Sequence, residues 1–75
     1  MEIELFAERF NEAITALGTT NAELARMIGV NQYSVKGWRT GRYMPDGYNI
    51  AKICKALNVS ADWLLGLEAT DDDEA

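Results

Sequence analysis

The sequence predicts an all-α fold, a compact domain of five helices. Apolar residues recur at spacings of three and four along successive stretches, which is typical of helices that bury one face. Most of these stretches are followed by glycine or asparagine, residues that commonly end helices. No stretch alternates apolar and polar residues with the period of two that a half-buried strand requires. These three observations favour helices throughout.

The first helix is expected to run to about Leu17 and the second from Asn21 to Ile28. The apolar stripe of the first helix consists of Ile3, Phe6, Phe10, Ile14 and Leu17. Thr20 and Glu23 have the spacing of a capping box, in which each side chain accepts a hydrogen bond from the other residue's backbone amide. Gly29 then ends the second helix.

The third helix is expected from Gln32 to Arg39, because the side-chain oxygen of Asn31 can cap its first turn. Pro45 and Asp46 mark the start of a fourth helix, which ends at Asn58. Gly47 stands at the beginning of this helix, where an apolar residue is usual, so its starting residue stays open.

Ser60 caps a fifth helix that Gly66 closes, so the folded domain is expected to cover residues 1–67. Residues 68–75 contain five acids, no base and no apolar residue other than alanine. Such a segment is expected to be an acidic disordered tail or the start of a linker to a further domain.

The charge is unevenly distributed along the chain. The net charge is −5, but residues 23–55 carry six bases against two acids, a local charge of +4. A polyanion responds to this local field more than to the net charge.

Several function classes are disfavoured. Histidine is absent and Cys54 is the single cysteine, so no zinc cluster and no Cys–His or Ser–His pair can form. Glu4, Glu8 and Glu12 fit a solvated helix face better than a catalytic pair. We therefore expect no enzyme, no cofactor and no metal. Cys54 is interpreted as a core residue in a reducing compartment, and with no leader or membrane-spanning run the expected location is cytoplasmic.

Two short helices joined by a tight turn need a small residue at their contact, a glycine where the chain reverses, and apolar groups beneath the second helix. Seven residues meet these requirements at fixed spacings: Leu24, Ala25, Ile28, Gly29, Val30, Val35 and Trp38.

The chain here resembles the phage-repressor and Cro-like helix-turn-helix proteins, the lambda-repressor-like domain of XRE type. The matching stretches are TNAELARMIGVNQYSVKGWRTGRYMP, Thr20 to Pro45, and IAKICKALNVSADWLL, Ile50 to Leu65. The resemblance implies that helices 2 and 3 form the helix-turn-helix and that helix 3 lies in the major groove of double-stranded DNA. It also implies a transcriptional regulator, expected to be a repressor.

By the same resemblance, the residues that read bases are Gln32, Tyr33, Lys36 and Gly37. The Gln32 amide can pair with adenine and Lys36 can donate to guanine, while Tyr33 can meet a thymine methyl or a phosphate. Gly37 costs a helix about 1 kcal/mol relative to alanine. Either its missing side chain lets the helix sit closer to the bases, or it is a tolerated weak position.

The phosphate contacts implied by the resemblance are Thr20, Asn21, Asn31, Arg39, Thr40, Arg42 and Tyr43. Arg39 replaces a glutamate that in many relatives pairs with an arginine of the first helix, and the matching position here is Ile14. With both partners absent, Arg39 is expected to face phosphate. Lys52 and Lys55 are interpreted as solubilising charges.

One such domain reads few base pairs, so a homodimer on a pseudo-palindromic operator is expected, with half-sites about 10 base pairs apart. The alternative is a protein-interaction module, such as an antitoxin or regulatory partner, that binds another protein through the acidic face of helix 1 or the tail.

Overall fold

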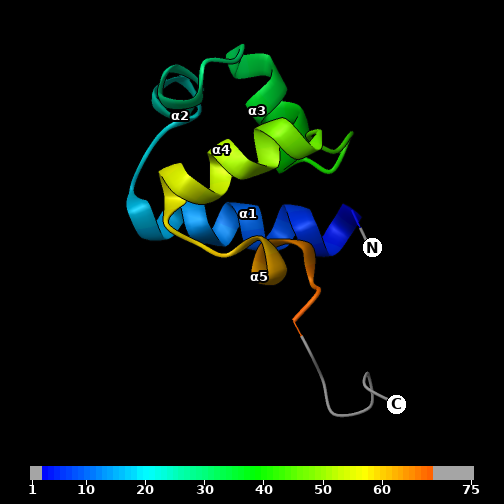
Figure 1. Ribbon diagram of the computed structural model, residues 1–75. Helices are drawn as coiled ribbons and strands as arrows, with labels where there is room; N and C mark the ends of the chain where they lie inside the picture. The colour runs from blue at the N-terminus through cyan, green and yellow to red at the C-terminus, as the bar shows by residue number, and fades with distance from the viewer. Residues whose placement is uncertain (1–2, 69–75) are drawn as a thin grey trace, which may run out of the picture.

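The computed structural model describes residues 3–68, and these form five helices and no strand (Figure 1). The prediction of an all-α, five-helix domain is confirmed. The helices are α1 (Ile3–Leu17), α2 (Asn21–Ile28), α3 (Gln32–Arg39), α4 (Gly47–Leu57) and α5 (Ala61–Leu65). The predicted acidic tail falls outside the described residues, apart from its first residue, Glu68.

Side-chain caps determine where the helices begin. The predicted capping box of α2 is present, and Ser60 accepts a hydrogen bond from the backbone amide of Trp63. The start of α4, left open by the sequence, is Gly47, because the Asp46 carboxylate accepts from the amide of Asn49 at 2.9 Å. A polar cap thus starts this helix without an apolar residue at its first position.

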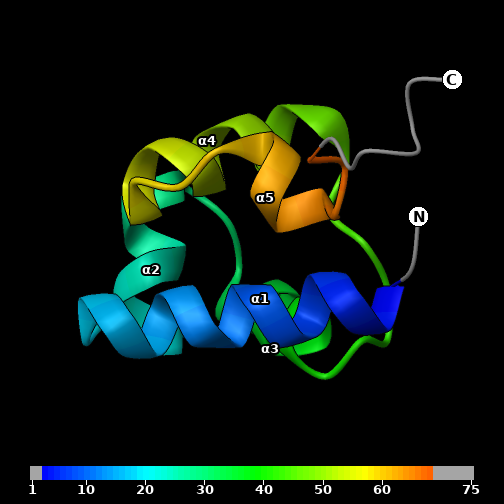
Figure 2. The ribbon, with the colours of Figure 1, turned by 90° about the horizontal axis from the view of Figure 1, so that it is seen from below.

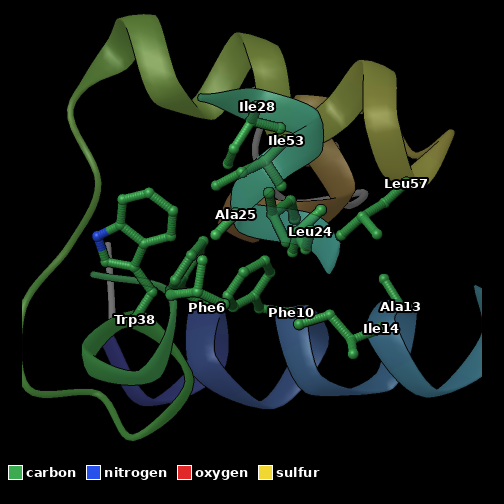
Figure 3. Packing of buried hydrophobic residues seen from close by; sticks show 12 residues of the cluster. Phe6, Phe10, Ala13, Ile14, Leu24, Ala25, Ile28, Trp38, Ile53 and Leu57 are labelled. Carbon is green, nitrogen blue, oxygen red and sulfur yellow. The ribbon is translucent and has the colours of Figure 1, made fainter. Parts of the chain in front are cut away.

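One hydrophobic core joins all five helices, and Figure 3 shows side chains of α1 to α4 converging on it. Phe6 and Phe10 of α1 stack with their ring centroids 5.3 Å apart, and Trp38 of α3 meets Phe10 edge-on at 6.2 Å. Burying each such side chain contributes about 1.5–3 kcal/mol to the stability of the fold. Leu17 continues the apolar stripe of α1 but is 49% exposed, because the end of the helix extends past the core.

Helix α1 packs against α3, α4 and α5, and Figure 2 shows α5 beside it. Cys54 is half-buried against the core, as its interpretation as a core residue requires, and burial raises the pKa of its thiol. Between residues 3 and 68, none of the helices combines the length and apolar character needed to cross a membrane.

Candidate nucleic-acid interface

The turn between α2 and α3 has the geometry that the sequence predicts. Gly29 adopts a left-handed backbone conformation with φ of 77°, which a residue with a Cβ rarely tolerates. The carbonyl of Ala25 accepts hydrogen bonds from the amides of Gly29 and Val30, at 2.8 and 3.0 Å. Ala25 itself is buried in the core that α2 and α3 share, so a larger residue there would disturb their packing.

Helix α3 has one buried and one exposed face. Val35 and Trp38 face the core and are 0% and 3% exposed. The opposite face carries three of the four residues expected to read bases, Gln32, Tyr33 and Lys36, and all three are exposed. Because the buried face of α3 packs against the core, the position of the helix is fixed, and these side chains project from it into solvent.

Asn31 fixes the beginning of that face. Its side-chain oxygen accepts a hydrogen bond from the amide of Tyr33 at 2.7 Å and so caps α3. Its side-chain amide group remains a donor, which suits the phosphate contact expected of it.

Gly37 is buried, and the reason is the aromatic ring of Tyr43. A Cβ built on Gly37 would lie 2.3 Å from Cζ of Tyr43, closer than any real contact. The expectation that the missing side chain leaves room for bases to approach therefore needs correction, since Tyr43 fills this space. Because the three clashing atoms belong to the far end of the tyrosine side chain, a Cβ at position 37 would displace the ring of Tyr43.

The first two phosphate candidates lie at the N-terminus of α2. The Thr20 hydroxyl accepts from the amide of Glu23 at 3.1 Å, and the Glu23 carboxylate accepts from the amide of Thr20 at 3.1 Å. The bond from the Thr20 amide, and next the bond that the Thr19 hydroxyl donates to the same carboxylate at 3.2 Å, lower the pKa of Glu23. The side-chain oxygen of Asn21 accepts from Arg39 at 2.7 Å, so its amide group is left as the free donor.

Arg39 differs from the expectation of a cation that faces phosphate. Its guanidinium donates to the side-chain oxygens of Asn11 in α1 and Asn21 in α2. Asn11 in turn donates to the backbone carbonyl of Arg39 at 2.9 Å. The guanidinium therefore already joins three helices within the domain.

The residue of α1 that contacts Arg39 is Asn11, which the sequence analysis did not single out. Ile14 is 2% exposed and belongs to the core, while Asn11, three residues earlier, makes the contact. Asn11 was missed because a single asparagine on a helix carries no distinctive signal. Its place one turn before the family's arginine position is the one clue in the sequence.

The remaining candidates follow α3. The Thr40 hydroxyl donates to the carbonyls of Lys36 and Gly37, at 3.1 and 3.2 Å, so it must rotate before it can donate to a phosphate. Arg42 and Lys36 are exposed, and the ion pair found within residues 3–68, Arg9 with Glu68, involves neither. Both cations are thus available to an anion.

Tyr33, Lys36, Gly37, Thr40, Arg42 and Tyr43 together line a hollow on the surface. The structure therefore brings together base-reading and phosphate candidates from α3 and the loop after it. Thr20 and Asn21 are not among the residues that line this hollow and lie instead at the start of α2, where Asn21 accepts a hydrogen bond from Arg39.

The acidic residues of α1 form a separate surface. Glu4, Glu8 and Glu12 are exposed at helical spacing and contribute nothing to the hollow beside α3. No group of three or more metal-binding side chains occurs between residues 3 and 68.

Two short helices at a tight glycine turn, the second presenting a polar outer face, define a helix-turn-helix protein. The sequence model of the helix-turn-helix family matches residues 11–64, which is most of the chain, and the chain belongs to this family.

Its relatives include regulators and phage repressors. The chain is 38% identical over 72 residues to the HTH-type transcriptional regulator for conjugative element SXT of Vibrio cholerae, covering 96% of this chain and 31% of the relative. It is 36% identical over 67 residues to the cryptic phage CTXphi transcriptional repressor RstR of Vibrio cholerae serotype O1, covering 89% and 60%. The chain thus spans about a third of the length of the first relative.

A solved structure shares the fold. The crystal structure of the P22 c2 repressor protein in complex with a synthetic operator superposes with a TM-score of 0.79 at 30% identity. The match covers 84% of this chain and 96% of that one.

Proposed function

We propose that this chain binds double-stranded DNA in a sequence-specific manner and regulates transcription, acting as a repressor by occupying an operator. The main support for the proposal is the exposed polar face of α3. The opposite face of this helix is buried in the core through Val35 and Trp38. The likeness of the fold to a repressor bound to its operator supports it.

Helix α3 has the dimensions to enter the major groove, which is about 12 Å wide. In this mode the N-terminal residues of the helix face base edges. The Gln32 amide offers one donor and one acceptor to adenine, and the Lys36 ammonium offers donors to guanine.

Phosphates on either side would hold α3 in register. The N-terminus of α2 offers backbone amides together with the Asn21 amide group, which Arg39 holds by its oxygen. On the other side Asn31 and Arg42 offer donors from the ends of α3.

A homodimer on a pseudo-palindromic site completes the proposal, because a single α3 reaches few base pairs. Residues 1–67 would form the DNA-binding domain, with residues 68–75 as tail or linker. The proposed location is the cytoplasm, where bacterial and phage operators lie. No catalytic step and no cofactor belongs to this function.

The test is enrichment of bound sequences from a random duplex pool at fixed moderate salt. A pseudo-palindrome with half-sites about 10 base pairs apart is the expected result. If the folded chain enriches no sequence, the proposal fails, and binding of a protein to the acidic face of α1 becomes the function to test.

A further inference from the structure

Tyr43 lies across the outer face of α3. Its ring covers Gly37, and a Cβ at that position would lie 2.3, 2.5 and 2.7 Å from three atoms of the side chain, Cζ, the hydroxyl oxygen and Cε1. The hydroxyl donates to the backbone carbonyl of Tyr33 at 3.3 Å. The ring therefore spans the helix surface between positions 33 and 37.

Backbone hydrogen bonds position the residues that lead up to this ring. The amide of Arg42 donates to the carbonyl of Gly37 at 2.9 Å, and the amide of Gly41 donates to the carbonyl of Trp38 at 3.3 Å. Gly41 permits the turn with φ of 74°. The chain thus folds back onto the end of α3 immediately before Tyr43.

Residues 33 and 37 lie on the same side of a helix, one turn apart. Gly37 is buried while Tyr43 remains 44% exposed. A ligand that approaches this face therefore meets Tyr43 at the place where the side chain of residue 37 would otherwise project.

We propose that Tyr43 determines sequence specificity by taking the place of the residue 37 side chain in the major groove, and that it favours an A·T pair. The inference rests on the proposed function, because it names a base reader within the same interface. It changes the expected role of Tyr43 from a phosphate contact to a reader of one base pair.

The chemistry of the exposed group selects the base pair. Since the hydroxyl hydrogen is donated to Tyr33, the hydroxyl oxygen keeps lone pairs that can accept a hydrogen bond. The ring edge offers apolar surface. Both A·T and G·C pairs offer an amino donor in the major groove, but only the A·T pair adds the thymine methyl, which suits the apolar ring edge.

The first experiment changes the DNA alone. In the operator enriched by the wild-type chain, each conserved thymine is replaced in turn by deoxyuridine, which removes only the methyl group. At one position in each half-site we expect wild-type binding to weaken about fourfold, the value of one buried methyl. The Tyr43→Ala variant should bind the operator with thymine at that position and the operator with deoxyuridine there with equal affinity.

The second experiment repeats the selection with variants. Tyr43→Ala is expected to lose the A·T preference at that base pair alone and to weaken operator binding about tenfold. Gly37→Ala should have the same effect, because the new Cβ displaces the ring. The double variant should be no weaker than either single variant, since both remove one contact.

Two further variants serve as controls. Tyr48→Ala removes an exposed tyrosine of α4 that is not part of the hollow, and the base preferences should stay unchanged. Tyr43→Phe keeps the ring over Gly37 and should retain the deoxyuridine effect. Circular dichroism verifies that each variant is folded.

Equal weakening on operator and random DNA with unchanged base preferences would overturn the inference, because Tyr43 would then contact only phosphate. Additive losses from Gly37→Ala and Tyr43→Ala would overturn it as well, and so would an absence of any deoxyuridine effect in the wild-type chain. If the wild-type chain enriches no sequence, the proposed function itself fails and the inference fails with it.

Discussion

Gln32 is exposed at the start of α3, where the proposed binding mode faces base edges. Asn31 caps α3, so Gln32 begins the helix with its amide exposed. Gln32→Ala should weaken binding to the selected operator by about 1–3 kcal/mol, with little effect on random DNA, because the pairing with adenine is lost. Fluorescence anisotropy titrations with both duplexes measure this. Equal losses on both would rule out base reading by Gln32.

Arg42 is expected to act through charge alone. It is exposed and forms no ion pair with another described residue. Arg42→Ala should weaken binding to all DNA and reduce the salt slope of the binding constant by about 1, because one fewer counterion is released. Lys55→Ala, which removes an exposed charge on α4, is the matched control and should leave the slope unchanged. An unchanged slope for Arg42→Ala would exclude a phosphate contact.

At the residue scale, periodicity and capping patterns identified the exposed face of α3 correctly. The contacts of Gly37 and Arg39 could not be found in this way. Both depend on residues from other elements, Tyr43 in one case and Asn11 and Asn21 in the other. Local patterns carry no information about which distant side chain fills a given space.

At the scale of elements, the capping box makes the start of α2 sensitive to pH. Hydrogen bonds donated to the Glu23 carboxylate by the Thr20 amide and the Thr19 hydroxyl lower the pKa of Glu23 in the folded chain. Because the pKa of Glu23 is lower in the folded chain, the charged carboxylate stabilises the fold. This contribution is fully present at a pH above the pKa of Glu23 in the unfolded chain, and it is lost as the pH falls through the pKa in the folded chain.

Glu23→Gln keeps an acceptor for the Thr20 amide but does not titrate. The variant should therefore lose less stability than the wild-type chain between neutral and acidic pH. Urea denaturation of both proteins across this range measures the difference. Parallel curves for the two would show that the carboxylate does not contribute to the pH dependence.

The helix bounds were the most predictable feature. The starts and ends of α2 and α3 follow from caps within a few residues of each terminus, and the predicted bounds match the structure. The start of α4 could not be decided from apolar periodicity, because Gly47 breaks the stripe. The cap formed by Asp46 decides it.

At the scale of the whole molecule, Arg39 connects α1, α2 and α3. Arg39→Ala leaves the half-buried oxygens of Asn11 and Asn21 without this donor and should lower the free energy of unfolding by about 1–3 kcal/mol. Arg26→Ala, an exposed base at the end of α2, is the control. Urea denaturation should show the loss only for Arg39→Ala.

The same variant distinguishes the internal role from a phosphate contact. If Arg39 acts within the domain, the salt slope of DNA binding stays unchanged in Arg39→Ala under conditions where the variant is folded. A reduced slope with unchanged stability would instead identify Arg39 as a phosphate ligand.

The C-terminal end of the described chain is also held in place. Arg9 of α1 lies over the Trp63 ring, 5.3 Å from its centroid, and donates to the Trp63 carbonyl. It forms an ion pair with Glu68 at 2.8 Å. The acidic composition of residues 68–75 assigned Glu68 to the tail. Composition could not reveal its partner, because Arg9 lies on a helix distant in sequence.

The outer face of α3 is the surface that we propose contacts DNA. The most direct test is to follow the backbone amide signals of the ¹⁵N-labelled chain by NMR while the selected operator is added. We predict the largest shifts in residues 31–37, at the start of α2 and at Tyr43. Shifts confined to the acidic face of α1 would contradict DNA contact by α3.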